Sequence, residues 1–225
     1  PVTEADLEVN DLLRDRLRGA RPDYGWLSEE TEDDKSRLTA SKFWVVDPID
    51  GTRAFAKGKP HFAISVALVS GGIPLIGIVF NPATDEFFEA ARGRGAWLNG
   101  QPIHVGSRRK VEGCRMVAHP PMFEHKAWPE RWPPMDFIER NSVAYRIALV
   151  ACGAADAVIA LSAKNDWDLA AAHLILEEAG GLLTAHDGHE IRYDGATTHQ
   201  PSLVGANPVL HAGIMARTAM LRLPS

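Results

Sequence analysis

The chain has 225 residues, of which 45% are hydrophobic and 24% charged, and its formal net charge at pH 7 is −5. A chain of this size buries a substantial core, and its acidic balance excludes a general attraction to nucleic acid or to an anionic membrane surface. Its apolar runs are too short to cross a bilayer, and two cysteines make no disulfide framework, which is typical of a protein of the reducing cytoplasm.

The first 50 residues predict a helix followed by a buried strand. Thr3 can cap the helix, and Gly19 and Pro22 end it. Because the helix signal begins so abruptly, we expect that further residues precede this chain. Phe43–Val46 is a short, wholly apolar run, which indicates a buried strand that stops at Asp47-Pro48.

The rest of the chain mixes strands and helices. Residues 61–69 and 73–80 predict a hairpin around Gly71-Gly72, with another strand at 86–90 and a tight turn at Asn99-Gly100. Further helices are expected at 142–152 and 168–179, strands at 157–161, 182–185 and 203–206, and a last helix capped by Asn207-Pro208. This pattern predicts a mixed α/β fold without repeats.

Residues 119–134 are rich in Pro, Trp and His. This composition predicts a long surface connection and makes the segment the expected boundary between two approximate halves, 1–118 and 135–225, of a single unit.

Chemistry concentrates where the apolar strand ends, at Asp47-Pro48-Ile49-Asp50-Gly51-Thr52. Two carboxylates after a buried strand are costly unless a positive group compensates them, and a divalent cation would do so. Gly51 allows close approach of the backbone, so the N–H groups of Gly51 and Thr52 would point at an anion. The alternative is that Asp47-Pro48 only ends the strand in a turn.

Two other acidic positions are weaker signals by themselves. Glu29-Glu30 would usually lie on a solvated surface, and Asp168 would usually cap the helix that follows it. Together with Asp47 and Asp50 they form a set of hard oxygen donors without a His or Cys cluster. Such a set favours Mg²⁺ or Mn²⁺ over Zn²⁺, and it suits a displacement at phosphorus assisted by two cations.

These motifs resemble those of the inositol monophosphatase superfamily. The resemblance runs from residue 2 to about residue 206, and the order of its motifs is as informative as any one of them. The matching segments are Val2–Asp6, Glu29-Glu30, Asp47–Thr52, and Trp167-Asp168 with the helix through Glu177-Glu178-Ala179 to Gly180-Gly181.

The resemblance implies a Mg²⁺-dependent phosphomonoesterase with alternating layers of helix and sheet and an active site between two halves. It implies these metal ligands: Glu29, Asp47, the Ile49 carbonyl, Asp50 and Asp168. Gly51 and Thr52 would bind phosphate through backbone N–H groups, with Asp50 beside them. Thr52 and Asp6 would orient the attacking water, with Glu30 nearby. Family members often form dimers and are often inhibited by Li⁺, so we expect a cytoplasmic homodimer.

The substrate stays open at this point. The leading expectation is a small phosphorylated metabolite such as inositol monophosphate. Thr52–Phe55 is closer to nucleotide-phosphate or histidinol-phosphate phosphatases, and Arg146 would contact a second phosphate in a 3′(2′),5′-bisphosphate nucleotidase, or lie on a helix surface. An alternative of another class is a non-catalytic partner of a macromolecule. The family's usual helix ahead of the Thr3 segment is not in the chain.

Overall fold

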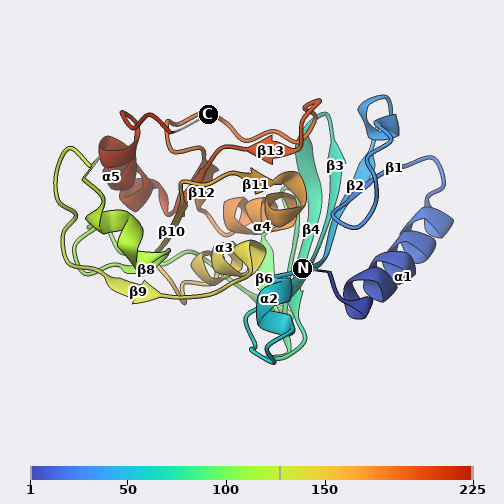
Figure 1. Cartoon of the computed structure of the whole chain (residues 1–225), viewed down its shortest axis with the longest axis horizontal. Helices are drawn as coiled ribbons and strands as arrows, with labels where there is room; N and C mark the ends of the chain where they lie inside the picture. The colour runs from blue at the N-terminus through green and yellow to red at the C-terminus, as the bar shows by residue number, and fades with distance from the viewer. Residues whose placement is uncertain (1, 127, 224–225) are drawn as a thin grey trace.

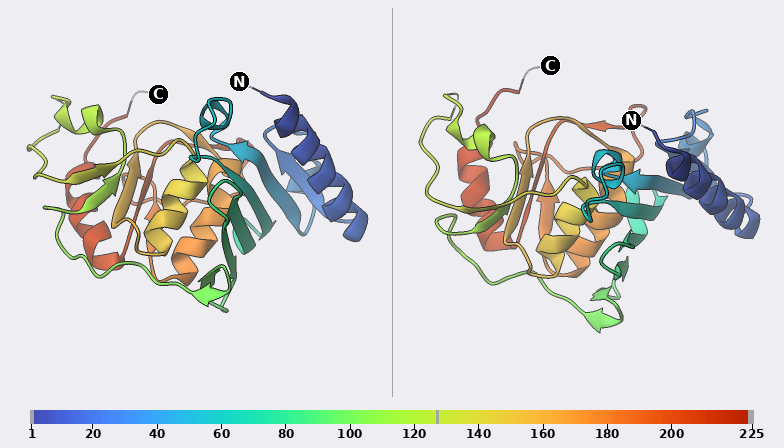
Figure 2. Two further views of the ribbon diagram at one scale, coloured as in Figure 1. Left: turned by 90° about the horizontal axis from the view of Figure 1, so that it is seen from below. Right: turned by 60° about the horizontal axis from the view of Figure 1, so that its bottom comes forward.

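Five layers of helix and sheet make up the structure, a computed structural model that describes residues 2–126 and 128–223. Across Figure 1 they are helix α1 (Glu4–Ala20), a seven-stranded sheet, the helices α3 (Val143–Ala151) and α4 (Asp166–Glu178), a five-stranded sheet, and helix α5 (Pro208–Thr218). The turned views of Figure 2 keep the same order. The predicted mixed α/β sandwich is therefore confirmed.

The seven-stranded sheet keeps its strands in chain order. They are β1 (Gly25–Ser28), β2 (Phe43–Asp50), β3 (Ala63–Ser70), β4 (Ile73–Asn81), β5 (Glu86–Ala91), β6 (Ala96–Leu98) and β7 (Gln101–Pro102). β1 is parallel to β2, and the later neighbours pair antiparallel. Gly71 and Gly72 join the predicted hairpin with φ angles of 56° and 75°, which glycine adopts without strain.

The five-stranded sheet has the order β12-β14-β10-β8-β9. Its strands are β8 (Arg115–Val117), β9 (Asp136–Ile138), β10 (Ala157–Ala160), β12 (Leu182–Thr184) and β14 (Leu203–Ala206), and a separate ribbon pairs β11 (Lys164–Asn165) with β13 (His199–Gln200). The segment 119–134 connects β8 to β9 and contains a short 3₁₀ helix, η2 (Pro120–Glu124). It is mostly exposed, as predicted, apart from residue 127, which lies outside the described residues. The division of the chain into halves there stays a prediction.

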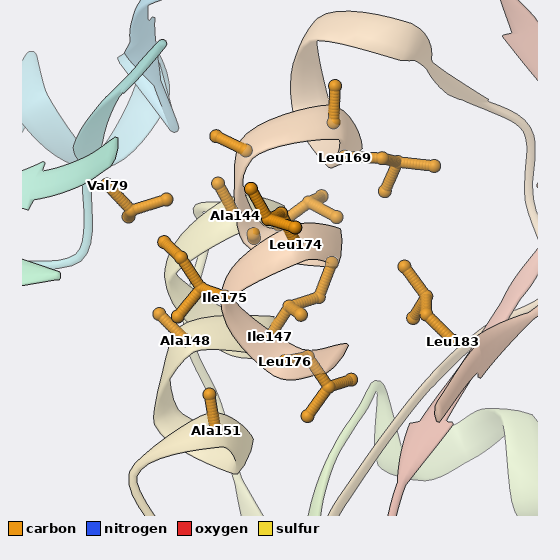
Figure 3. Packing of buried hydrophobic residues seen from close by; sticks show 14 of the residues in the cluster. Val79, Ala144, Ile147, Ala148, Ala151, Leu169, Leu174, Ile175, Leu176 and Leu183 are labelled. Carbon is orange, nitrogen blue, oxygen red and sulfur yellow. The ribbon is translucent and has the colours of Figure 1, made fainter. Parts of the chain in front are cut away.

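The main core lies between the sheets, around α3 and α4. Figure 3 shows Ile147 and Leu174 packed between Val79 of the first sheet and Leu183 of the second. Ile147 and Leu174 have no exposed surface, and complete burial of such a side chain stabilises the fold by about 1.5–3 kcal/mol. The two apolar helices pack between the two sheets, and this packing fixes the positions of the elements that end near the site.

Two predicted boundaries were wrong. The strand beginning at Phe43 does not stop at Asp47-Pro48 but runs on to Asp50, and the pairing of β2 with β3 shifts register between Asp47 and Asp50. This irregularity accommodates a proline that cannot donate to the ladder. Helix α4 begins at Asp166, two residues earlier than predicted, because Asn165 rather than Asp168 is its N-cap.

Candidate active site

Three carboxylates from distant parts of the chain meet at one point. Asp47 and Asp50 lie at the end of β2, and Asp168 lies in the first turn of α4. One ligand oxygen from each of the three lies within 4.8 Å of the others. The juxtaposition predicted from the sequence is therefore present, and it depends on packing α4 against the first sheet.

The oxygens of this cluster differ in their hydrogen bonds. Asp50 Oδ2 accepts from Ser142 Oγ and from the Ala144 N–H, both at 2.6 Å, at the start of α3. Asp168 Oδ2 accepts from the Asn165 N–H at 2.8 Å. Asp47 Oδ1 accepts from the Ile49 N–H at 3.0 Å, but its Oδ2 is buried and accepts from no N–H or O–H donor of the described residues. The side chain that meets this carboxyl is another acid, Glu29.

An unpartnered buried carboxylate oxygen is costly, and like charges crowd it. Burial, and then the charges of Asp50, Glu29 and Asp168, raises the pKa of Asp47 well above its ordinary value. Burial and the charge of Asp168 raise the pKa of Asp50 to about 8. This donor set is rich in oxygen, and its pKa values stay raised in spite of the nearby cations, so it fits a hard divalent cation.

The Glu29-Glu30 pair follows β1, and the Glu29 side chain reaches the Asp47 carboxyl of this cluster. The Glu29 N–H donates to Val46 O at 3.2 Å, so pairing of β1 with β2 brings the pair to the end of the same sheet. Glu29 is open to solvent, yet desolvation and the charges of Asp168 and Glu30 raise its pKa to about 7. Glu30 is half-exposed, and desolvation and the charge of Asp6 raise its pKa.

Asp6 and Thr52 make a buried pair beside the carboxylates. Thr52 Oγ1 lies 3.1 Å from Asp6 Oδ1 and 3.0 Å from Ile49 O, so its single proton is shared between two acceptors. Asp6 Oδ2 accepts from the Thr3 N–H at 2.8 Å, which fixes the carboxylate at the first turn of α1. A hydroxyl held in this way keeps its lone pairs free to accept a hydrogen bond.

Gly51 lies in a turn that no other residue fits. Its φ is +92°, and an added Cβ would lie 2.9 Å from His61 O and 3.0 Å from Ser142 N. Thr52 begins the short helix α2 (Thr52–Phe55), whose first N–H groups have no intrahelical partner. The turn therefore presents backbone donors close to the carboxylates.

Two cations lie close enough to act on the carboxylates. Arg146 on α3 is half-buried, and its positive charge opposes the rise in the pKa of Asp50. Lys164 on β11 is also half-buried; desolvation lowers its pKa, and the charges of Asp168 and Asp50 oppose that change. Sequence reasoning had singled out Arg146 but had missed Lys164.

Sequence reasoning also missed the groups that hold Asp50. Ser142 was predicted to begin a helix, and its Oγ does accept from the Tyr145 N–H at 2.9 Å as an N-cap. The same hydroxyl donates to Asp50, 92 positions earlier in the chain. The cap signal was readable in the sequence, but its second partner depends on the fold.

Comparison with known proteins identifies the family. The model of the inositol monophosphatase family matches residues 1–221. The chain belongs to the inositol monophosphatase family. It is therefore a phosphatase, a hydrolase of a metal-dependent family that acts on small phosphorylated substrates.

Named relatives agree with this assignment. The chain is 38% identical over 195 residues to an inositol-1-monophosphatase of Rhizobium meliloti, covering 83% of this chain and 73% of that one. It is 33% identical over 221 residues to the Nus factor SuhB of Xylella fastidiosa, covering 94% and 79%. The structure of a Thermotoga maritima IMPase matches with a TM-score of 0.82 at 30% identity, covering 96% of this chain and 82% of that one.

No membrane-spanning helix occurs in the described part of the chain, since none of its helices is both long and apolar enough.

Proposed function

We propose that the protein is a Mg²⁺-dependent phosphomonoesterase and that inositol monophosphate is the first substrate to test. The meeting of Asp47, Asp50 and Asp168 around an unpartnered buried carboxylate oxygen carries this proposal. With these three, the Glu29 carboxylate and the Ile49 carbonyl would hold the cations. When bound, Mg²⁺ supplies positive charge for the phosphate and for the departing oxygen. Mn²⁺ would satisfy the same donors.

The chain's own groups would bind phosphate and position water. The backbone N–H groups of Gly51 and Thr52 would face the phosphate, since the positive φ of Gly51 turns the chain toward it. The Thr52 hydroxyl would accept a hydrogen bond from the attacking water while Asp6 holds its orientation, and Glu30 would assist from nearby. Asp50 would line the phosphate side of this turn.

Phosphate release from inositol 1-phosphate tests the proposal, with Mg²⁺ and with EDTA. Asp168→Asn should lower turnover more than a hundredfold, because it removes one of the three converging carboxylates. Asp11→Asn is the matched control, since Asp11 lies on the exposed face of α1 in a surface pair with Arg14. Equal turnover with Mg²⁺ and EDTA would contradict the proposal.

A second role is raised by relatives that are named Nus factor SuhB. In this alternative the chain is a non-catalytic partner of a macromolecule, and Asp50→Asn would leave its cellular role intact. A loss of that role on Asp50→Asn, with the protein still folded, would favour catalysis.

We infer that the protein is also a cytoplasmic homodimer that Li⁺ inhibits. Two free cysteines, Cys114 and Cys152, support a reducing compartment. Light scattering would give the mass in solution, and phosphate release with increasing LiCl against a KCl control would test inhibition.

A further inference from the structure

Helix α1 buries two polar residues where a surface helix normally buries apolar ones. Asp6 and Asn10 are its buried residues, with 1% and 2% of their surface exposed. Leu12 of the same helix is 56% exposed. Burial of an amide group costs free energy unless the group finds hydrogen-bond partners. The buried position of Asn10 therefore calls for an explanation, because the reaction proposed above gives a role to Asp6 alone.

Asn10 finds its partners around the turn that follows strand β1. Its Oδ1 accepts a hydrogen bond from Ser28 Oγ at 2.7 Å, and both side chains are buried. Its Nδ2 donates at 3.3 Å to Thr31 Oγ1, which also accepts from Trp26 Nε1 at 3.4 Å. Ser28 and Thr31 form a β-bridge on either side of the Glu29-Glu30 pair. Asn10 thus ties α1 to the turn that carries these two glutamates.

Asp6 and Asn10 lie on the same face of α1. They are four residues apart in the helix, so their side chains project from adjacent turns in nearly the same direction. Asp6 Oδ1 accepts from Thr52 Oγ1 at 3.1 Å. A rotation or slide of α1 that breaks the hydrogen bond between Asn10 and Ser28 therefore also moves the Asp6 carboxylate away from the Thr52 hydroxyl.

Apolar packing holds the other half of α1. Leu13 and Leu17, which follow Asn10 in the helix, pack against the apolar cluster around Val46 of the first sheet. The helix is the outer layer of the structure (Figure 1), so its orientation depends on its contacts with this one sheet. Apolar contacts are non-directional and tolerate small shifts, whereas a buried hydrogen bond specifies one arrangement. The polar contacts of Asn10 therefore fix the N-terminal half of the helix.

We propose that Asn10 is a positioning residue of the active site. Its hydrogen bond with Ser28 fixes the orientation of α1, and this orientation sets the Asp6 carboxylate against the Thr52 hydroxyl that would hold the attacking water. Asn10 acts through Asp6 and leaves the three converging carboxylates as they are. This inference rests on the proposed function and keeps its reaction, and it adds a residue outside the motifs that match the family.

A paired variant, Asn10→Leu with Ser28→Ala, removes the hydrogen bond from both sides. Replacing both partners by apolar groups costs little stability, and Thr31 Oγ1 keeps Trp26 as its partner. Phosphate release from inositol 1-phosphate and from p-nitrophenyl phosphate, with Mg²⁺, gives the rates. We expect kcat to fall about 10- to 100-fold, because a displacement of about 1 Å at a reacting group costs up to that factor. KM, and the Mg²⁺ affinity measured by calorimetry, should stay unchanged.

A control on the same helix separates positioning from a general loosening of α1. Leu17→Ala removes apolar contact between the helix and the sheet and leaves the Asn10 hydrogen bond in place. It should lower the urea midpoint of unfolding more than the paired variant does, while its kcat stays close to that of wild type.

A double-mutant comparison identifies the group through which Asn10 acts. In a protein that already carries Asp6→Asn, the paired variant should lower kcat little further, because residues that act as a unit have non-additive effects. A merely structural role of Asn10 would lower kcat by the same factor in both backgrounds.

The positioning role and the proposed function fail in different ways. A folded paired variant with the kcat of wild type, or an equal loss of kcat in Leu17→Ala, would overturn the role of Asn10 and leave the phosphatase in place. If the paired variant does not fold, Ser28→Ala alone, which removes a single oxygen atom, is judged by the same loss of kcat. Absence of Mg²⁺-dependent phosphate release from both compounds by the wild-type protein would overturn the proposed function, and the positioning role with it.

Discussion

Replacing Asp50 with Asn should make the metal-free protein more stable at the same time as it removes activity. In the native protein the pKa of Asp50 is raised from 3.8 to about 8, first by burial and then by the charge of Asp168. A carboxyl whose folded pKa is raised supports folding fully only below its unfolded pKa. That contribution is lost as the pH rises toward the folded pKa, because folding must then take up a proton.

The size of this effect follows from the two pKa values. Each pH unit above 3.8 lowers the free energy of unfolding by about 1.4 kcal/mol. At pH 7 proton uptake by Asp50 therefore costs the metal-free protein up to about 4 kcal/mol of stability. At pH 5 the same cost is about 2 kcal/mol. The amide of Asn is neutral at both pH values, and its oxygen can still accept from Ser142 Oγ and the Ala144 N–H.

Urea unfolding in EDTA at pH 5 and pH 7 measures the difference in the free energy of unfolding between wild type and Asp50→Asn. We expect Asp50→Asn to be more stable than wild type, and the difference in the free energy of unfolding should be about 2.5 times as large at pH 7 as at pH 5. Saturating Mg²⁺ should stabilise wild type by more than 2 kcal/mol at 100 times its Kd and the variant by much less. A metal-free variant less stable than wild type at pH 7, or a gap that does not change with pH, would refute the reasoning. Asp11→Asn should show no gap at either pH.

Three further outcomes follow from the site. Thr52→Val should lower kcat at least 100-fold while Thr52→Ser keeps most activity, because only the hydroxyl contacts Asp6. Steady-state kinetics with inositol 1-phosphate would check this. Equal losses of kcat in the two variants would contradict it. Gly51→Ala should destabilise the fold by more than about 1 kcal/mol in thermal unfolding, since its Cβ would need a positive φ and would lie 2.9 Å from His61 O. Mg²⁺ affinity, measured by calorimetry, should rise about 10-fold or more between pH 6 and pH 8. The reason is that the cation displaces protons from groups such as Glu29, whose pKa is about 7. An affinity that does not change with pH would contradict this.

The parts of the fold that were predictable are those set by near neighbours in the chain. The Asn207-Pro208 start of α5 is one example, since the Asn207 side chain accepts from the N–H groups of Val209 and Leu210 as a cap should. The hairpin at Gly71-Gly72 is another, because both glycines take the positive φ that the turn requires. Each signal and its structural consequence lie within a few residues.

Short strands were missed for a physical reason. β1 has four residues and β8 three, and neither shows an alternation long enough to separate a strand from a loop. Both are strands because their neighbours supply the hydrogen-bond ladder: β1 pairs with β2, and β8 pairs with β9 and β10. The missed β1 matters for function, since it carries Glu29 and Glu30 to the site.

The site was predictable in its residue types but not in its surroundings. The acidic character of the strand end at Asp47 and Asp50 is visible in the sequence, because polar groups after so apolar a strand call for compensation. Which groups surround them depends on contacts that cross the chain. Ser142 reaches Asp50 from 92 positions away, and Lys164 approaches through a two-residue strand that had no sequence signal.

The position of the carboxylates explains how so costly a cluster can persist. Asp47 and Asp50 extend from the end of a strand, and Asp168 lies in the first turn of a helix. Each acid is therefore attached to an element that buries an apolar stretch in the main core. The packing of α3 and α4 between the sheets holds these ends together even where the carboxylates repel one another. Repulsion is therefore relieved by proton uptake rather than by movement, and a divalent cation binds by displacing those protons.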